Sequence, residues 1–470
     1  GCTCIHAAFW RQDNHDNMRI IIIGAGPGGY ETALLAAKRG VEVTLIESGP
    51  VGGTCLNEGC IPTKAFCRNA RVMDEIRGAS AFGFHDVAYS FDFKSVVERK
   101  NAVVQQLRSG VEGLLAHKMI NFVRGRAYFK AADTVCVDSD GEVKEFTADY
   151  MIMATGSVPA SLPVPGADLP GVLTSREILD SEEVPHRLCV IGGGVIGLEF
   201  ASIFNSFGSE VTVLEYCKDI LPRFDSDLSK RLRQSFGRKG IVINVQSQVT
   251  GIRNFGNGEE YEVSFLRKGC EETVVADKVL MAVGRKPAVS SLNLEAAGVI
   301  YTPKGIAVNG SMQTNVPHIY AIGDVNGIMM LAHAAVFQGV VALDHIMGQE
   351  NGINLSVIPS AVFTVPEAAC VGKTEEDCKA DGIAFRCLKS FFRANGKAVA
   401  MGEPEGFCKI IVSDDDQEKI LGCHLFGAHS ADIVQEMCAL ITCGATVGQV
   451  RDVIHAHPTL SEVLQSALHA

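Results

Sequence analysis

The sequence contains no apolar run that approaches the roughly 18–20 residues needed to span a bilayer, so membrane insertion is not expected. Acidic residues are scattered rather than massed, and the net charge of -12 disfavours nucleic acid as a partner. The only Trp, Trp10, lies in residues 1–17, which lack the basic start and apolar core of a secretory signal. Cys2, Cys4 and His6 lack the fourth ligand of a closed zinc site, so we expect a poorly ordered extension without metal.

The composition indicates a large globular protein from a reducing compartment. With 470 residues the chain is about three times the usual domain length, which predicts two or more domains. A hydrophobic content of 47% and a charged content of 20% exclude a mainly disordered chain. Most of the 16 Cys lie in apolar stretches, so we expect a cytoplasmic protein whose cysteines, outside one motif discussed below, are small buried hydrophobes.

The most informative feature is an internal repeat. The segment GAGPGG at 24–29 follows an apolar run and opens a helical stretch, which leads to a second apolar run ending at Glu47. The same order recurs around GGGVIG at 192–197 and ends at Glu215. The first glycines and the terminal acids are both 168 residues apart (192 − 24 and 215 − 47). This register predicts two βαβ nucleotide-binding folds of similar build.

Each glycine of the G-x-G-x-x-G pattern has its own physical role. The first permits a tight turn, the second lets the backbone approach a pyrophosphate, and the third lets helix and strand pack closely. The helix N-terminus offers N–H groups to the phosphates, and the terminal acid accepts hydrogen bonds from a ribose. Because a carboxylate at Glu215 would repel a 2′-phosphate, the second fold should prefer NAD over NADP.

The pattern changes after Ser356. Predicted strands at 360–363, 408–412 and 420–425 mix with predicted helices at 432–443 and 460–468, which indicates a separate α+β domain. Before it, the sequence AIGD at 321–324 reads as a strand followed by Gly-Asp. That form suits packing against a cofactor.

Two cysteines with four residues between them, Cys55 and Cys60, lie in the segment GGTCLNEGCIPTK at 52–64. The spacing matches neither a zinc site nor C-x-x-C. In a regular helix the two would be about 7.5 Å apart along the axis, which strains a disulfide, and Gly59 is placed to supply a distortion. Pro62 suits a first helical turn, so Cys60 should lie near a helix N-terminus, where a thiol pKa is lowered. We expect an exchangeable disulfide; two structural thiols are the alternative.

At this segment the chain resembles a known family, the FAD-dependent pyridine nucleotide-disulfide oxidoreductases, and the likeness extends from Met18 to the C-terminus. The resemblance implies an α/β fold with two Rossmann-like nucleotide-binding folds, for FAD and NAD, followed by an α+β dimerisation domain. The implied FAD-binding domain covers 18–160 and 285–354. The implied NAD-binding domain covers 161–284, and the dimerisation domain 355–470.

The resemblance also assigns roles to individual residues. Cys60 is implied to face the flavin and Cys55 to exchange with substrate, while Lys64 and Glu199 form an ion pair near the flavin. The implied FAD contacts are Gly24, Gly26, Gly29, Glu47, Gly53, Thr54, Lys64, Gly125, Thr155, Gly156, Ser157, Asp324, Met330, Leu331, Ala332 and His333. The implied NAD contacts are Gly192, Gly194, Val195, Ile196, Gly197, Glu199, Glu215, Val249 and Gly284.

Within the family the strongest likeness is to the dihydrolipoamide dehydrogenases. Glu215 favours NAD, and HAHPTLSE at 455–462 is similar to their C-terminal signature. In that signature His457 is the base that takes a proton from a dithiol, and Glu462 orients it. Thr459 and Glu462 also fit a capping box, so Glu462 has a structural role as the alternative, and both roles stay open.

The implied reaction is oxidation of a dihydrolipoyl dithiol by NAD through the Cys55–Cys60 disulfide and FAD, with His457 supplied by the partner subunit of a homodimer. The implied protein partners are lipoyl domains of 2-oxoacid dehydrogenase complexes or the H protein of the glycine cleavage system. Open alternatives are another flavin disulfide reductase, a soluble pyridine nucleotide transhydrogenase, and a non-catalytic flavoprotein that only binds partners. One departure from the family is Ala428-His429, where a Pro-Gly pair is common.

Overall fold

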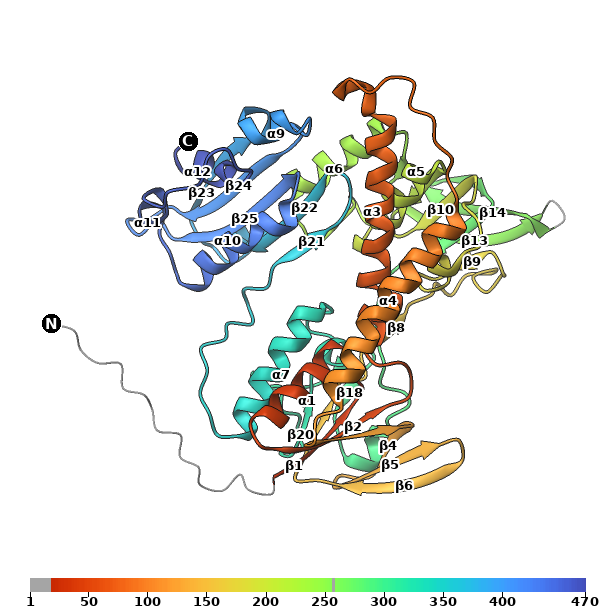
Figure 1. Cartoon of the computed structure of the whole chain (residues 1–470), viewed down its shortest axis with the longest axis vertical. Helices are drawn as coiled ribbons and strands as arrows, with labels where there is room; N and C mark the ends of the chain where they lie inside the picture. Colours follow the sequence, from red (N-terminus) through yellow and green to blue (C-terminus); the bar gives the residue numbers. More distant parts are fainter. Residues whose placement is uncertain (1–17, 256–257) are drawn as a thin grey trace. The chain divides into compact units, whose positions relative to one another are not determined.

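The computed structural model describes residues 18–255 and 258–470, which form parts of two compact units (Figure 1). The first unit contains residues up to 57 together with 105–158 and 286–353, and the second contains 58–104, 159–285 and 354–470. Cys2, Cys4 and His6 lie outside the described residues. In the described part of the chain, every helix is too short or too polar to cross a membrane.

The core of the first unit is a five-stranded parallel sheet in the order β20-β7-β1-β2-β3. Its central strand β1 is almost completely buried from Ile20 to Ile23, as a parallel strand covered on both faces must be. Strand order reverses beside β1, and ligands of such sheets bind outside the carboxyl ends of the strands at that point. The strands are β1 (Arg19–Ile23), β2 (Glu42–Glu47), β3 (Ile120–Arg124), β7 (Tyr150–Met153) and β20 (Ile319–Ala321).

Two helices of this unit, α1 (Pro27–Lys38) and α7 (Ala332–Ile346), lie side by side because small residues line their contact (Figure 1). A Cβ on Gly28 would lie 3.1 Å from the Cβ of Ala335, and a Cβ on Gly339 would lie 1.9 Å from Oγ1 of Thr32. The unit also contains α2 (Gly53–Glu58) and an antiparallel sheet formed by β4 (Arg126–Ala131), β5 (Thr134–Ser139) and β6 (Glu142–Thr147).

The second unit repeats this build, which confirms the predicted pair of nucleotide-binding folds. Its parallel sheet has the order β12-β11-β10-β16-β9. In the chain, helix α5 (Val195–Phe207) connects β10 to β11, and helix α6 (Ser226–Arg238) connects β11 to β12. In the chain, the three strands of an antiparallel sheet come between β12 and β16: β13 (Ser247–Phe255), β14 (Glu260–Arg267) and β15 (Cys270–Ala276). In the first unit, β4 to β6 come between β3 and β7 in the same way. The parallel strands are β9 (Val172–Leu173), β10 (Arg187–Ile191), β11 (Glu210–Leu214), β12 (Val242–Asn244) and β16 (Lys278–Met281).

The remainder of the second unit contains the predicted α+β domain. Five antiparallel strands pair in the order β21-β22-β25-β24-β23, with α10 against β22 and β25 and α12 against β23 and β24. The strands are β21 (Ser360–Val362), β22 (Glu367–Gly372), β23 (Phe385–Phe391), β24 (Phe407–Ser413) and β25 (Ile420–Gly427). The helices are α8 (Glu375–Ala380), α9 (Gly396–Ala400), α10 (Ser430–Thr442), α11 (Val447–Arg451) and α12 (Glu462–Leu468). Earlier in the chain the second unit contains α3 (Cys60–Arg77), and α4 (Phe93–Leu115) belongs to the second unit up to residue 104 and to the first from residue 105.

The expectation that the remaining cysteines are buried holds only in part. Cys270 and Cys443 are exposed, because Cys270 follows a turn at the start of β15 and Cys443 ends α10. Five cysteines are fully buried within strands or helices, and the others outside the motif are half-buried. The buried five are Cys136, Cys189, Cys378, Cys408 and Cys423.

A buried ion cluster joins α6 to the last sheet within the second unit. Lys409 on β24 is 0% exposed, and its Nζ lies 2.8 Å and 2.9 Å from the carboxylate oxygens of Asp225, the N-cap of α6. Asp227 lies 3.1 Å away, and Glu375 completes the set. These carboxylates outweigh the cost of burial and raise the pKa of Lys409. The ammonium therefore stays charged in the interior, where an unpaired ion would be strongly disfavoured.

Lys409→Met is expected to lower the free energy of unfolding by about 3–5 kcal/mol, because it leaves the buried Asp225 without its cation. The matched control is Lys389→Met. Lys389 is half-exposed and forms an ion pair with Asp227 at the surface, so its loss should cost less than about 1 kcal/mol. Urea denaturation of the three proteins measures the difference. If Lys409→Met and Lys389→Met lowered the free energy of unfolding by equal, small amounts, the buried pair of Lys409 and Asp225 would not have the importance assigned to it.

Candidate active site

The two glycine-rich turns are held by the same hydrogen bonds at the same 168-residue spacing. Glu47 accepts from the N–H groups of Ala25 and Gly49, both at 2.7 Å. Glu215 accepts from those of Gly193 at 2.5 Å and Cys217 at 2.6 Å. Each acid therefore closes its own turn at the end of the second strand. A ribose hydroxyl placed there would meet a carboxylate that the backbone has already oriented.

The glycines at both turns are required by the backbone. Gly24 and Gly192 have φ values of +104° and +111°, and a Cβ would lie 2.4 Å and 2.3 Å from a carbonyl oxygen of the neighbouring strand end. At the third glycines, Gly29 and Gly197, a Cβ would lie 1.8 Å and 2.0 Å from the oxygen of the first glycine. These contacts agree with the predicted close packing of strand and helix.

The middle glycines differ from the others because space lies in front of them. A Cβ on Gly194 would meet nothing within 4 Å, and one on Gly26 only the Cα of Gly53 at 3.9 Å. The α1 and α5 N-termini, which begin just after Gly26 and Gly194, present N–H groups toward that space. The residues present therefore fit a pyrophosphate at both turns.

The other sequence-predicted contacts of the first unit lie on loops at the carboxyl ends of its strands. Ser157 Oγ donates to Asp324 Oδ2 at 2.5 Å, and Thr155 Oγ1 donates to the carbonyl of Ala288 at 3.0 Å. Gly156 has φ of +72° and no atom within 4 Å of a Cβ position. Asp324 lies in a 3-10 turn after β20, where the strand-then-Gly-Asp pattern placed it. Met330 and Leu331 lead into α7, which starts at Ala332 with His333 exposed.

Three predicted contacts occupy different surroundings. Gly125, with φ of +154°, donates its N–H to the carbonyl of Glu47 at 3.0 Å, so it lies directly after β3 and beside Glu47. Val249 is buried in β13 within an apolar core of the second unit. Gly284 follows β16 with φ of +124° and open space around its Cβ position.

The cysteine motif has the helix break that its spacing required. Cys55 lies in α2, Cys60 is the first residue of α3, and Gly59 interrupts the helix with φ of -138° and ψ of -108°. Pro62 lies in the first turn of α3, so the predicted place of Cys60 at a helix N-terminus is confirmed. Asn57, which the sequence did not single out, braces α2 by donating to the carbonyls of Val51 and Gly53 at 2.9 Å.

Lys64 and Glu199 form an ion pair within the second unit. The Lys64 Nζ lies 3.0 Å and 2.9 Å from the two carboxylate oxygens of Glu199, which is 3% exposed. Burial disfavours the Lys64 ammonium, but the charge and hydrogen bonds of Glu199 outweigh it, so the pKa of Lys64 is raised. Lys64 therefore carries a fixed positive charge.

Phe363 is the residue at this pair that sequence reasoning missed. Its N–H donates to Glu199 Oε1 at 2.9 Å, and the Lys64 Nζ lies 4.5 Å from the centre of its ring. Cys67, on α3, donates its thiol to the Phe363 carbonyl at 3.3 Å. Phe363 ended a predicted strand and carried no chemical signal, since its contribution comes mainly from the peptide group.

His457 and Glu462 lie together near the C-terminus. Nδ1 of His457 is 2.9 Å from Oε1 of Glu462, whose Oε2 accepts from the N–H of Thr459 at 2.8 Å. These two interactions lower the pKa of Glu462, the backbone N–H more than the imidazole. One carboxylate thus serves both partners. The capping box is only half formed, because Thr459 Oγ1 donates to the Ala456 carbonyl instead of capping α12.

The geometry of this dyad leaves one imidazole nitrogen available. Because Nδ1 faces a carboxylate, Nδ1 carries the hydrogen and Nε2 is left as the acceptor. The His457 side chain is 77% exposed, so Nε2 is reachable from solvent. An imidazole in this state is suited to take a proton from a thiol.

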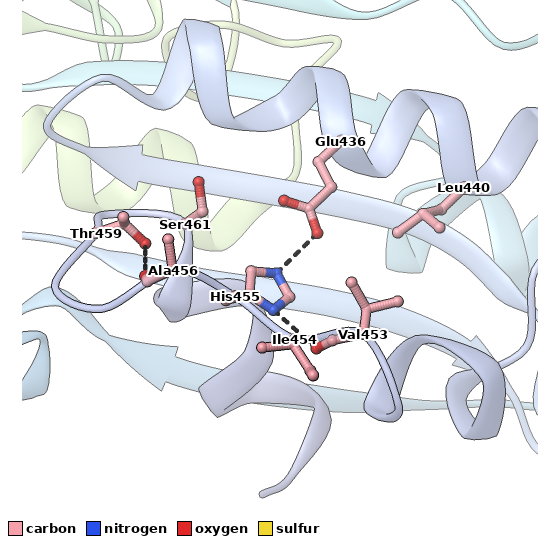
Figure 2. A pocket seen from close by; sticks show the side chains of 8 residues that line it. All are labelled: Glu436, Leu440, Val453, Ile454, His455, Ala456, Thr459 and Ser461. Carbon is pink, nitrogen blue, oxygen red and sulfur yellow. Dashed lines mark hydrogen bonds and ion pairs between the residues drawn. The ribbon is translucent and has the colours of Figure 1, made fainter.

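The segment before His457 lines one side of a groove of about 350 Å³ (Figure 2). Figure 2 shows His455 pointing to Glu436 on α10, with Nε2 and Oε1 2.9 Å apart, and its ring is only 5% exposed. Ile454, next to it, is 94% exposed. The residues just before His457 in the sequence thus include a histidine with a buried side chain, His455, and an exposed apolar residue, Ile454.

Comparison with known proteins agrees with this geometry. Residues 18–339 match the family described as pyridine nucleotide-disulphide oxidoreductase, and residues 358–468 match the dimerisation domain of the same family. The second match indicates that the chain associates as a homodimer.

Similar proteins cover nearly the whole chain. A dihydrolipoyl dehydrogenase of Chlamydia muridarum is 40% identical, with 96% of each chain covered, and one of Bacillus subtilis is 38% identical over 96% of this chain and 98% of its own. Among solved structures, LpdA from Mycobacterium tuberculosis has a TM-score of 0.89 at 27% identity, covering 96% of this chain and 99% of its own. The HOCl-induced flavoprotein disulfide reductase RclA from Escherichia coli has a TM-score of 0.85 at 30% identity, with the same coverage. The chain therefore belongs to the pyridine nucleotide-disulphide oxidoreductases, a family of enzymes that use FAD and NAD.

Proposed function

We propose that this enzyme is a dihydrolipoyl dehydrogenase, which reoxidises protein-bound dihydrolipoyl groups with NAD as the acceptor. The observation that carries the proposal is the exposed His457 imidazole, held through Nδ1 by Glu462. A dithiol substrate needs such a base, whereas hydride exchange between two nicotinamides does not. The relatives named dihydrolipoyl dehydrogenase, at 38–40% identity, support the same choice.

The proposed site residues act in the following order. Nε2 of His457 takes a proton from one dihydrolipoyl thiol, and the resulting thiolate attacks the sulfur of Cys55 in a Cys55–Cys60 disulfide. In this attack the bond between the two cysteines breaks, and Cys60 departs as a thiolate, which the N-terminus of α3 stabilises. The second substrate thiol then attacks the substrate sulfur of the mixed disulfide and gives its proton to Cys55, so that oxidised lipoyl leaves and Cys55 is released as a thiol. The substrate loses two electrons, and the cysteine pair gains them.

The proposed cofactor contacts follow the two turns. Gly24, Gly26, Gly29 and Glu47 would hold FAD in a domain of residues 18–160 and 285–354, and the second turn with Glu215 would hold NAD in residues 161–284. When bound, FAD supplies the two-electron route from the cysteine pair to NAD. Lys64, kept charged by Glu199, would favour the reduced, anionic flavin ring.

The proposed partners are the lipoyl domains of 2-oxoacid dehydrogenase complexes or the H protein of the glycine cleavage system. His457 would act on the site of the other subunit, with the dimerisation domain at residues 355–470. Ile454, exposed beside the dyad, supports a surface that a partner subunit covers. We also propose a cytoplasmic location, since the described cysteines outside the motif are free thiols, which a reducing compartment maintains.

The test is NAD reduction by dihydrolipoamide with the purified, FAD-loaded homodimer. Steady turnover with dihydrolipoamide, and little with glutathione disulfide or between NADPH and NAD, is the expected result. The similarity to RclA makes another flavin disulfide reductase the second candidate. Disulfide reduction by NADH without dihydrolipoamide oxidation would favour that candidate and contradict the proposal.

Glu215→Ala is expected to lower kcat/KM for NAD by about 10–100-fold, because a ribose loses hydrogen bonds to a charged group. The activity ratio of NAD to NADP should fall, since the carboxylate that repels a 2′-phosphate is gone. Steady-state kinetics with both nucleotides measure the ratio. Glu47→Ala is the matched control from the first turn, and it should weaken FAD retention without changing the ratio. An unchanged ratio in Glu215→Ala would refute the assignment.

A further inference from the structure

Cys67 makes a contact to which the proposed reaction assigns no role. It lies three residues after Lys64 on α3, and its Sγ donates to the carbonyl of Phe363 at 3.3 Å. The N–H of the same Phe363 donates to Glu199 Oε1 at 2.9 Å, and Glu199 holds Lys64. A chain of hydrogen bonds thus runs from the Cys67 thiol through one residue to the ion pair.

We propose that Cys67 is a positioning residue for Lys64, acting through Phe363 and Glu199. The thiol fixes Phe363, the Phe363 N–H fixes the Glu199 carboxylate, and the carboxylate fixes the ammonium. The inference rests on the proposed function, because the place of the Lys64 charge matters to the reaction only with FAD beside it.

The physical argument is that a buried ion pair needs its remaining polar positions satisfied. Glu199 is 3% exposed, so the N–H of Phe363 replaces water at one of its oxygens. Without a donor at position 67, the Phe363 carbonyl would lose its hydrogen bond from Cys67, and the Phe363 N–H would be held less firmly. If the Phe363 N–H is held less firmly, the Glu199 carboxylate is free to move away from Lys64. The contact between the Lys64 ammonium and the Phe363 ring would weaken as well.

The thiol is chemically suited to a fixed donor role. Burial, and then the charge of Glu199, raise the pKa of Cys67, so it keeps its hydrogen throughout the neutral range. The charged and titratable groups that act on this cluster are Glu199 from α5, Glu367 from β22, and Cys60 with Lys64 on α3 itself. Of these, Glu199 accounts for the raised pKa of Lys64 against the effect of burial.

The test compares Cys67→Ala and Cys67→Val, which lack a donor, with Cys67→Ser, which keeps one. The readout is the alkaline pH titration of the absorption spectrum of bound FAD in the homodimer. Because Glu199 raises the pKa of Lys64, a looser carboxylate should move the alkaline transition to lower pH, by roughly 0.5–1 pH unit. Cys67→Ser should restore the wild-type transition. Cys189→Ala is the control, since Cys189 is buried with burial as the sole cause of its raised pKa.

The outcomes separate the inference from the proposed function. A wild-type protein that binds FAD but does not oxidise dihydrolipoamide would refute the proposed function, while the titration would still test the inference. Unshifted transitions in both donor-free variants would overturn the inference. So would a shift in Cys67→Ser or in Cys189→Ala as large as the shift in Cys67→Ala. Cys67→Val fills more of the site than Cys67→Ala, so it provides the measurement if the smaller side chain prevents folding.

Discussion

Cys60→Ser is expected to lower dihydrolipoamide-dependent NAD reduction by about 10⁴-fold or more. Losses of this size are typical when one member of a group of catalytic residues that work together is removed. Serine cannot form the disulfide that accepts the two electrons of the dithiol. It also lacks the acidity that lets a thiol leave as a thiolate at the N-terminus of α3. Cys55→Ser should show a loss of the same size, since each cysteine is useless without the other.

The decisive comparison is with reactions that bypass the cysteines. NADH should still reduce bound FAD in Cys60→Ser, because that step needs only the two nucleotide sites. Cys443→Ser is the control, as Cys443 is an exposed cysteine at the end of α10. Stopped-flow absorbance gives both rates. A Cys60→Ser enzyme that oxidises dihydrolipoamide at the wild-type rate would exclude the dithiol mechanism.

Much of the architecture could be predicted because its signals are local. The glycine turns, the acids at Glu47 and Glu215 and the break at Gly59 each follow from backbone requirements within one short segment. The 168-residue repeat also includes hydrogen bonds that the motifs did not indicate. The N–H groups of Gly49 and Cys217, which donate to Glu47 and Glu215, are 168 residues apart as well.

Contacts between distant segments could not be predicted in the same way. Phe363 reaches Glu199 because β21 ends next to α5, and Lys409 on β24 reaches Asp225 because the neighbouring strand β25 packs on α6. Neither contact corresponds to a periodic pattern in the sequence, so neither could be predicted from it. The exposure of Cys270 and Cys443 was missed because their apolar character says nothing about their places at element ends.

The role of Glu462 shows how one residue can satisfy two patterns. The sequence left a capping box and a catalytic dyad as alternatives, and the structure has one carboxylate bonded to both Thr459 and His457. The backbone N–H fixes the carboxylate, and the carboxylate then fixes the imidazole. A local folding signal thus serves as part of the proposed catalytic geometry.

His457→Gln is expected to lower the rate of dihydrolipoamide oxidation by about 10²–10⁴-fold, the usual contribution of a positioned general base. Glutamine retains a polar side chain of similar length but cannot take a proton. Glu462→Gln should cause a smaller loss, because the His457 ring stays in place while the carboxylate charge that supports its protonated form is removed. Because the pKa of Glu462 is lowered, this carboxylate should stay charged in the wild-type enzyme to a lower pH than an ordinary glutamate would.

The measurement is the pH dependence of kcat/KM for dihydrolipoamide, with FAD reduction by NADH as the internal reference. That reference rate should be unchanged in His457→Gln, since the dyad touches only the dithiol half of the reaction. His429→Asn, at an exposed histidine of the same domain, should leave both rates intact. Because His457 would act on the partner's site, each mixed dimer of one His457→Gln chain and one Cys60→Ser chain holds one site with an intact base and an intact disulfide. Such a dimer should therefore have about half the activity of a wild-type dimer, which holds two such sites. Complete inactivity of those mixed dimers would place the base and the disulfide on the same chain.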